Sequence, residues 1–348
     1  MTERADVVEK KDIRDLSLAE LRQELEALGE PAYRAEQIFA WLYKRGAASF
    51  EAFTDLSKGL RQTLAERFTI AGLELFATQQ GHDRTEKFLF RLDDGQFIET
   101  VLIPAGERAT VCVSTQVGCK YRCAFCASGR HGFKRNLRPA EITGQVLYLR
   151  DRLRLELTNV VFMGMGEPLD NFENLERVLR IMNAPEGMGL AARRLTVSTA
   201  GHVPGIRRFA ELDLQVNLSL SLHAATDRLR SSLMPINKKW PLTEVVEAAE
   251  AYVKKSGRMM TIEWVLLAGG NDTPEDAEGL AAIAKRLRAK VNLIPFSPVA
   301  GCDFQAPDEA RTALFRRRLE ERRVRVTVRE SKGRDILAAC GQLAGRPQ

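Results

Sequence analysis

The sequence predicts an α/β protein whose core is a parallel β-sheet. From about residue 108 onward, short apolar runs typical of buried strands alternate with longer segments typical of helices, and this alternation favours parallel strands joined by helices. Unusual polar and glycine-rich stretches recur where the strand-like runs end. The periodicity leaves open whether the sheet is doubly wound or curled into a barrel. In both arrangements the carboxyl ends of the strands form one site.

The first segment, residues 1–70, is expected to form a small helical domain. Ser17 and Glu20 have the spacing of a capping box, and leucines follow at helical spacing over residues 18–28. Gly29 and Pro31 interrupt this helix. Further helices are expected around residues 38–42 and 56–68.

Residues 71–107 predict a β-hairpin extension. Apolar and polar residues alternate over 87–92 and again over 96–101, which is the pattern of half-buried strands. Asp93, Asp94 and Gly95 lie between the two runs and are typical of a tight turn.

The remaining segment, residues 108–348, contains six β-α units. Strands are expected at 110–117, 159–163, 194–198, 214–222, 259–267 and 290–295. Helices are expected, among others, at 139–153, 174–182, 242–255 and 274–288. A last apolar run at 324–329 predicts one further strand.

Composition excludes several classes of protein. The 348 residues are 45% hydrophobic and 28% charged, which is ordinary for a folded globular chain. No apolar stretch approaches the roughly 20 residues that span a bilayer, and the charged N-terminus lacks the apolar core of a signal peptide. We therefore expect a cytoplasmic protein without a membrane anchor. The net charge of +6 permits a polyanionic partner without identifying one.

Cysteine spacing is the densest chemical signal. Four of the six cysteines fall within residues 112–126, which favours metal or redox chemistry over structural disulfides in a chain without a signal peptide. Cys119, Cys123 and Cys126 form a C-x3-C-x2-C run after the first expected strand. Three thiolates on a four-iron cluster would leave one iron open for a small molecule. Zinc would need a fourth ligand such as His131, and closed zinc sites usually take cysteines in two close pairs.

This triplet, placed after the first strand of a six-unit array, resembles that of the radical S-adenosylmethionine (SAM) superfamily. The resemblance extends to the loop 164–168 (GMGEP) after the second strand and to short polar residues at later strand ends. It implies a partial (β/α)6 barrel, a [4Fe-4S] cluster held by the three cysteines, and SAM as a second cofactor. The residues implied to contact SAM are Gly166, Glu167, Ser198, Ser221, Leu222, His223 and Ser297.

Two further cysteines point to one family within this superfamily. Cys112 lies seven residues before the triplet, and Cys340 lies near the C-terminus in the run AACGQL. Together with FIETV around Glu99 and GFKRNL at 132–137, they resemble the RlmN-type RNA adenine-C2 methyltransferases from about residue 12 to 345. This family resemblance implies methylation of carbon 2 of an adenosine in 23S rRNA, with tRNA as a second candidate substrate.

The resemblance also implies a mechanism, because carbon 2 of adenine is electron-poor and does not attack a methyl sulfonium directly. Cys340 first takes a methyl group from one SAM molecule. A second SAM, cleaved at the cluster, yields a radical that removes hydrogen from this S-methyl group, and the methylene radical adds to adenine. Cys112 then releases the RNA and forms a transient Cys112–Cys340 disulfide. Glu99 matches the family's proton acceptor, although a polar residue on a hairpin strand is otherwise interpreted as structural.

One position departs from the family pattern, and other activities stay open. Ser297 stands where the family usually has asparagine, and its hydroxyl has a shorter reach. A carbon-8 methyltransferase of the Cfr type shares the cysteine set. The alternative from another class is a non-catalytic, metal-stabilised RNA-binding protein. Cys302 is expected to be a bystander.

Basic residues near the triplet are expected to attract RNA phosphates. They are Lys120, Arg122, Arg130, Lys134, Arg135 and Arg138. A second basic run over 311–325 is more typical of a solvated helix face, because Glu320 and Glu321 interrupt it. The family implies a flavodoxin-type electron donor, and we expect a monomer.

Overall fold

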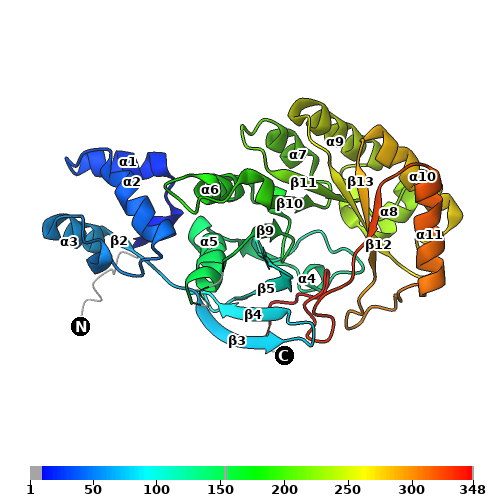
Figure 1. Ribbon diagram of the computed structural model, residues 1–348, viewed down its shortest axis with the longest axis horizontal. Coiled ribbons are helices and arrows are strands. Elements are labelled where there is room, and N and C mark those ends of the chain that lie inside the picture. The colour runs from blue at the N-terminus through cyan, green and yellow to red at the C-terminus, as the bar shows by residue number, and fades with distance from the viewer. Residues whose placement is uncertain (1–9, 153, 155, 347–348) are drawn as a thin grey trace, which may run out of the picture.

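The computed structural model describes residues 10–346 apart from 153 and 155 (Figure 1). A small helical bundle, at the left of Figure 1, is followed by antiparallel strands at the bottom and by a curved parallel sheet with helices on its outer side. No helix within these described residues is both long and apolar enough to cross a lipid bilayer.

The N-terminal bundle has its own apolar core. Its elements are α1 (Leu18–Ala27), α2 (Arg34–Phe39), α3 (Lys58–Arg67) and the short parallel pair β1 (Lys11–Asp12) and β2 (Phe68–Thr69). The expected capping box is confirmed, because Ser17 Oγ accepts the Glu20 N–H at 3.2 Å and Glu20 Oε2 accepts the Ser17 N–H at 2.8 Å. Leu147 and Ile181 of the barrel helices join this core, so the bundle packs directly against the barrel.

The expected hairpin is present, and a third strand extends it. The antiparallel strands are β3 (Glu74–Gln80), β4 (Glu86–Arg91) and β5 (Phe97–Ala105). The turn lies where it was predicted, with the Leu92 N–H donating to the Gln96 carbonyl at 2.8 Å. β5 also pairs antiparallel with β6 (Arg108–Cys112), so that Val101 lies opposite Cys112. The hairpin sheet therefore continues into the barrel sheet.

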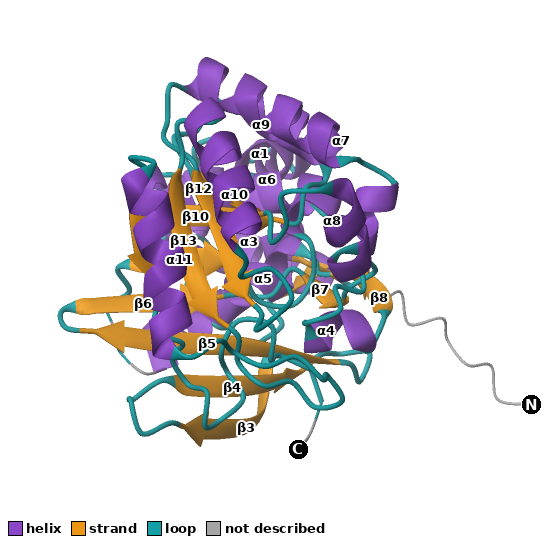
Figure 2. Cartoon of the chain, turned by 90° about the vertical axis from the view of Figure 1, so that its right-hand side faces the viewer, coloured by secondary structure: helices purple, strands orange, loops and turns teal. Residues whose placement is uncertain are grey.

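The barrel contains the six expected parallel strands and a seventh. They are β6, β9 (Asn159–Phe162), β10 (Leu195–Thr199), β11 (Asn217–Ser221), β12 (Thr261–Leu266), β13 (Lys290–Pro295) and β14 (Val326–Val328). The covering helices are α5 (Pro139–Leu147), α6 (Phe172–Asn183), α7 (Val203–Ala210), α8 (Asp227–Leu233), α9 (Leu242–Ser256), α10 (Pro274–Arg286) and α11 (Glu309–Glu321) (Figure 2). The ten-stranded sheet ends at β14 and β3, and among the described residues no ladder joins these two strands. The predicted partial barrel is confirmed.

The first barrel strand is shorter than predicted. The strand expected at 110–117 ends at Cys112, and a separate strand β7 (Gln116–Gly118) pairs antiparallel with β8 (Phe133–Asn136). Gly118 has φ of +71°, and a Cβ there would lie 1.7 Å from the Gly132 carbonyl oxygen. The close approach of these two strands requires glycine, and it folds the intervening residues into a compact loop that carries the cysteine triplet.

The C-terminal residues 329–346, called here the C-terminal strap, close the open side of the barrel. The strap leaves β14 and runs to the hairpin, as the red segment of Figure 1 shows. The Gly333 N–H donates to Asp83 Oδ2 at 3.0 Å, and the His82 N–H donates to Asp335 Oδ2 at 2.9 Å. Hydrogen bonds to aspartate side chains thus connect the strap, which follows β14, to the turn between β3 and β4. They link the two ends of the sheet, which no backbone pairing of strands joins in the described residues.

Candidate active site

The three cysteines of the predicted cluster line one cavity of about 150 Å³. They lie on the loop between β7 and the short helix α4 (Ala127–Arg130). Burial raises the pKa of Cys119 to about 12 and also raises the pKa of Cys123 and Cys126, so burial by itself favours neutral thiols. Within the described residues, no group of three His, Cys, Asp or Glu side chains is arranged to hold a single metal ion. A four-iron cluster is wider than one ion, and this donor set suits it.

The same cavity collects most of the predicted SAM contacts from the carboxyl ends of the strands. Residues that line it together with the cysteines include Gly166, Glu167, Ser198, Ser221, His223, Glu263, Arg329 and Cys340. Parallel topology explains this arrangement, because every parallel strand ends at the same edge of the sheet.

The loop after β9 presents backbone and carboxylate to the cavity. Gly166 has φ of +100°, and a Cβ there would lie 2.5 Å from Gln116 Cβ, so only glycine fits. Glu167 Oε2 accepts the Ala200 N–H at 2.7 Å and Oε1 accepts the Leu169 N–H at 3.2 Å. Burial nevertheless dominates and raises the pKa of Glu167 to about 7. A cationic ligand in the cavity would favour the charged carboxylate.

Short polar groups at later strand ends complete this wall. The Oγ atoms of Ser198 and Ser221 lie 3.4 Å apart. His223 Nδ1 accepts the Val265 N–H at 2.9 Å, which leaves Nε2 as its donor, and the ring packs edge-on against Phe125. Burial, assisted by Arg230, lowers the pKa of His223 to about 3, so this imidazole is neutral.

Two predicted SAM contacts lie behind the cavity wall. Leu222 is fully buried in the apolar core, with its N–H donating to the Glu263 carbonyl at 3.1 Å. Ser297 is also buried, and among the described residues its Oγ has no hydrogen-bond partner. An unpartnered buried hydroxyl is unfavourable, and a polar ligand atom would satisfy it.

Cys112 and Cys340 share a second cavity of about 90 Å³, which Cys126 also lines. Cys112 is buried at the end of β6, and burial raises its pKa to about 12. Cys340 is exposed on the C-terminal strap. The Ala127 N–H donates to the Gly341 carbonyl at 2.7 Å. The residues that follow Cys126 and Cys340 are therefore hydrogen-bonded, and the strap is seated on the cysteine loop.

Glu99 lies beneath the strap and lines neither cavity. It is 1% exposed, and its Oε1 pairs with Lys87 Nζ at 3.1 Å. Oε2 accepts the N–H groups of Ala344 and Gly345 at 2.6 and 2.8 Å. Every oxygen of this carboxylate is engaged, and the contacts fix the strap just beyond Cys340.

Arg329 and Glu263 line the site but were not predicted. Arg329 follows β14 directly and lines both cavities. The charge of a Cys340 thiolate is the main cause that raises the pKa of Arg329, with smaller contributions from Glu263 and Cys112. The strand-end rule, applied to the last apolar run at 324–329, would have found Arg329. Glu263 is a charged residue inside the otherwise apolar strand β12. This unusual position is the one feature of the sequence that could have pointed to a functional role.

The predicted RNA-attracting cations are partly neutralised inside the protein. Three of the six carry ion pairs: Arg135 with Asp94 and Glu141, Arg138 with Asp15 and Asp93, and Lys120 with Asp170. Apart from Glu141, which lies six residues after Arg135, these acidic partners come from distant parts of the sequence. The local absence of acidic residues therefore did not reveal them. Arg130 donates to Cys302 Sγ at 3.0 Å, and Cys302 donates to the Ala124 carbonyl at 3.1 Å. Cys302 therefore packs on the cysteine loop without lining either cavity.

A partial (β/α)6 barrel with this cysteine loop at the carboxyl ends of its strands defines a radical SAM enzyme. Residues 113–284 match the radical SAM superfamily model, and residues 11–70 match that of the ribosomal RNA large subunit methyltransferase N-terminal domain. A crystal structure of a radical SAM methyltransferase from Sphaerobacter thermophilus superposes with a TM-score of 0.91 at 46% identity, covering 97% of this chain and 100% of the other.

Two curated relatives show to which family of radical SAM enzymes the chain is similar. The dual-specificity RNA methyltransferase RlmN of Syntrophus aciditrophicus is 45% identical, over 96% of this chain and 97% of the relative. That of Geobacter sulfurreducens is 46% identical, over 96% and 92%. The chain belongs to the RlmN family of dual-specificity RNA methyltransferases.

Proposed function

We propose that this protein methylates carbon 2 of an adenosine in 23S rRNA, with tRNA as a second substrate. The observation that carries the proposal is the cavity shared by Cys112, Cys340 and Cys126. Two thiols outside a cluster triplet have no role in an ordinary methyl transfer. They are required when a protein-bound carbon must first be attached to the RNA and then released.

The described residues fit the two cofactors. Cys119, Cys123 and Cys126 would hold a [4Fe-4S] cluster, and the strand-end residues around Gly166 and Glu167 would hold SAM. When bound, these groups supply a methyl group and a carbon-centred radical. The glycine-only position 166 lets a ligand in this cavity approach the backbone closely, whereas Ser297, another of our proposed SAM contacts, lies behind the cavity wall.

The side chains of this protein would then carry and release the methyl carbon. Cys340 is exposed on the strap and is accessible to accept it. Cys112 is buried against the same cavity and would attack Cys340 sulfur to release the RNA, leaving a disulfide that a reductant resets. Arg329 lines the cavity that both thiols share, and its positive charge lowers the pKa of Cys112 against the larger opposing effect of burial. Glu99 remains our proposed proton acceptor, provided that one of its present contacts opens. We also propose a flavodoxin-type electron donor and a monomeric enzyme.

The decisive experiment identifies the methylated atom. The protein is reconstituted anaerobically with iron and sulfide and incubated with SAM, a reductant and either a 23S rRNA fragment or tRNA. The RNA is digested, and its nucleosides are compared with standards by mass spectrometry. Methyl on carbon 2 supports the proposal, and methyl on carbon 8 indicates the sister activity. SAM cleavage without a methylated nucleoside would point to another RNA.

The role of Cys112 is tested by trapping. In Cys112→Ala the thiol that releases the RNA is absent, so we expect a covalent protein–RNA adduct that resists denaturation and is seen as a shifted band on a denaturing gel. Cys302→Ala is the matched control, because Cys302 contacts the cysteine loop but lines neither cavity, and it should give free methylated RNA. Recovery of only free methylated RNA from Cys112→Ala would disprove the role.

A further inference from the structure

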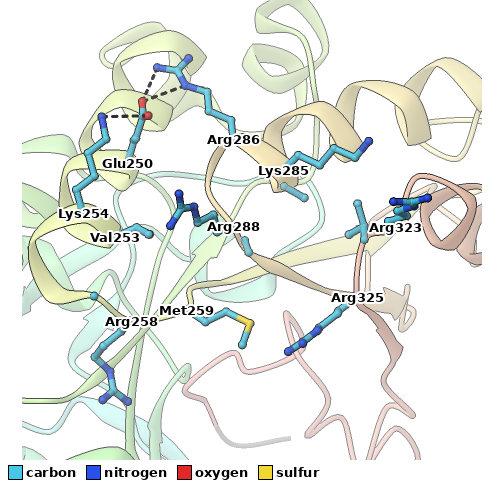
Figure 3. Close-up of a pocket in the computed structure, with 14 residues that line it drawn as sticks. Glu250, Val253, Lys254, Arg258, Met259, Lys285, Arg286, Arg288, Arg323 and Arg325 are labelled. Atoms are coloured by element: carbon cyan, nitrogen blue, oxygen red, sulfur yellow. Dashed lines mark hydrogen bonds and ion pairs between the residues drawn. The ribbon is translucent and has the colours of Figure 1, made fainter.

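A further cavity lies at the opposite end of the barrel from the cysteines. It has a volume of about 730 Å³ and lies where α9, α10 and α11 end and β12, β13 and β14 begin (Figure 3). Seven cationic residues line it, and we call it the basic hollow. They are Lys254, Arg258, Lys285, Arg286, Arg288, Arg323 and Arg325.

Few of these charges are neutralised within the protein. Glu250 is the one carboxylate of the lining, and it pairs with Lys254 at 3.3 Å and with Arg286 at 2.9 Å. The dashed lines of Figure 3 mark these contacts. Arg258 donates to the neutral side chains of Gln215 and Asn217. Among the described residues, the remaining four cations make no side-chain hydrogen bond or ion pair. They are Lys285, Arg288, Arg323 and Arg325.

Helix termini alone do not explain this concentration of charge. Basic residues are favourable at helix C-termini, and three helices end here. Each C-terminus carries about half a negative charge, so the three ends and Glu250 together offset roughly two to three of the seven positive charges. Roughly four to five remain. Such an excess of like charge destabilises a compact fold unless an anion offsets it, so the hollow is suited to an anionic partner.

We propose that the basic hollow binds the phosphodiester backbone of the substrate RNA, away from the target base. Five of the seven cations are arginines, whose planar donors match phosphate oxygens in pairs. Met259 is 49% exposed within the hollow and offers an apolar surface beside the phosphates. The inference rests on the proposed function, because it assumes an RNA substrate.

The position of the hollow favours RNA over an acidic redox protein. β12 and β13 are six residues long, which places the hollow about 20 Å from the cysteine end of the barrel. An electron donor seated there would be separated from the cluster by the whole barrel. A ribosomal RNA fragment or a tRNA extends well beyond that distance and can contact both ends.

The test measures RNA binding directly, in the full chain. Arg288→Gln, Arg323→Gln and Arg325→Gln are combined, and the affinity for a labelled 23S rRNA fragment and for a tRNA transcript is measured against salt concentration. We expect binding to weaken about tenfold or more at low salt, and the slope of log K against log salt to fall by about 2 to 3. The control removes three exposed arginines of the antiparallel strands and their turns, Arg84, Arg91 and Arg108, of which Arg91 pairs with Glu74, and should change binding little. Glu250→Gln should tighten binding.

Each other outcome has a defined meaning. Unchanged affinity and slope in the hollow variant would overturn the proposal. Unchanged RNA binding, with methylation lost only when flavodoxin is the reductant and retained with dithionite, would assign the hollow to the redox protein and also overturn it. If the native protein fails to methylate carbon 2 while the hollow variant still loses RNA affinity, the proposed function fails and the hollow keeps its role.

Discussion

At the scale of single residues, the buried pair of Lys87 and Glu99 has the largest predicted effect on stability. Both side chains are almost fully buried. Lys87→Met would leave the Glu99 charge without its cation, and we expect the free energy of unfolding to fall by about 3–5 kcal/mol. The double variant Lys87→Met/Glu99→Gln removes both charges and should recover most of this loss. Urea denaturation measures both, and equal losses in the two variants would contradict the argument.

His223 makes stability depend on pH. Its pKa is lowered by burial from an ordinary 6.5 to about 3, so the unfolded chain binds a proton in a pH range where the folded chain does not. The free energy of unfolding should therefore fall as pH decreases from about 6.5 toward 3, by up to about 1.4 kcal/mol per unit from this group. His223→Gln keeps an acceptor for the Val265 N–H and should flatten this slope. Parallel profiles for the two proteins between pH 7 and 4 would refute it.

The residues of the site could be predicted only where they follow strand order. Glu167, Ser198 and His223 meet because parallel strands end at one edge, and the sequence shows that order. The contact between Cys340 and the cysteine loop depends on the path of the strap, to which residues such as Asp83 and Glu99 contribute from more than 200 positions away. No local pattern encodes that path, so Cys340 could be assigned only by resemblance.

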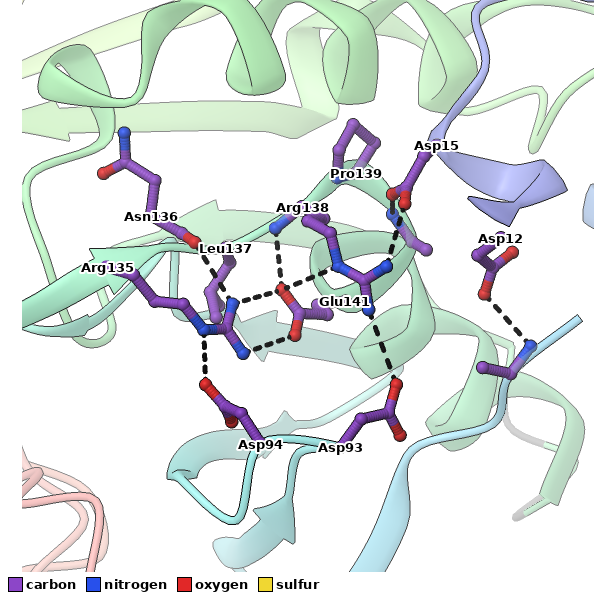
Figure 4. Close-up of polar contacts among 12 residues, drawn as sticks. Asp12, Asp15, Asp93, Asp94, Arg135, Asn136, Leu137, Arg138, Pro139 and Glu141 are labelled. Carbon is purple, nitrogen blue, oxygen red and sulfur yellow. Dashed lines mark hydrogen bonds and ion pairs between the residues drawn. The ribbon is translucent and has the colours of Figure 1, made fainter. Parts of the chain in front are cut away.

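At the scale of elements, one buried carboxylate adds polar contacts to the apolar junction between the bundle and the barrel. Asp15 Oδ1 accepts the Ala140 N–H at the start of α5 at 2.9 Å, and Oδ2 accepts from Arg138 at 3.2 Å (Figure 4). Asp15→Ala leaves that buried N–H without a partner, at a cost of about 1–3 kcal/mol. Hydrogen exchange should show faster exchange in α1 and at the start of α5.

Asp93 supplies the matched control for this junction. It also contacts Arg138, at 3.5 Å, but its side chain is 69% exposed. Exposed pairs contribute little, so Asp93→Ala should stay within about 0.5 kcal/mol of the native protein. Equal effects of Asp15→Ala and Asp93→Ala would mean that the arginine, and not the buried N–H, determines the junction.

The ends of helices and strands could be predicted where a periodic apolar pattern stops at residues that favour a turn. The strand predicted at 290–295 is observed as Lys290–Pro295. The strand predicted at 110–117 is divided, because Ser114 and Thr115 leave the sheet to reach the Gly164–Gly166 loop, with Ser114 Oγ accepting the Met165 N–H at 2.9 Å. The apolar pattern of a strand does not show such a hydrogen bond to a residue 51 positions away, so the break in the strand could not be predicted. The helix predicted at 139–153 ends as α5 at Leu147 and continues as a π-helical turn, Tyr148–Arg152, and its last predicted residue lies outside the described residues.

At the scale of the whole molecule, cluster loading should be coupled to folding. Three partly buried thiols must become thiolates to bind iron, and only the folded chain holds them together. Reconstitution with iron and sulfide should therefore raise the unfolding temperature measured anaerobically. Chelation should reverse the shift, and a variant with serine at Cys119, Cys123 and Cys126 should show none. A shift of equal size in that variant would place the metal elsewhere.

Because the C-terminal strap is synthesised last, the cysteine loop is exposed for a time on the ribosome. The strap covers the cysteine loop, yet its residues are synthesised about 200 positions after Cys126. At a translation rate of about 5–20 residues per second, the loop exists for roughly 10–40 s before Cys340 leaves the ribosome. During that interval the strap cannot obstruct delivery of iron and sulfide to the nascent chain. The barrel closes last, and Cys340, the proposed methyl carrier, arrives with it.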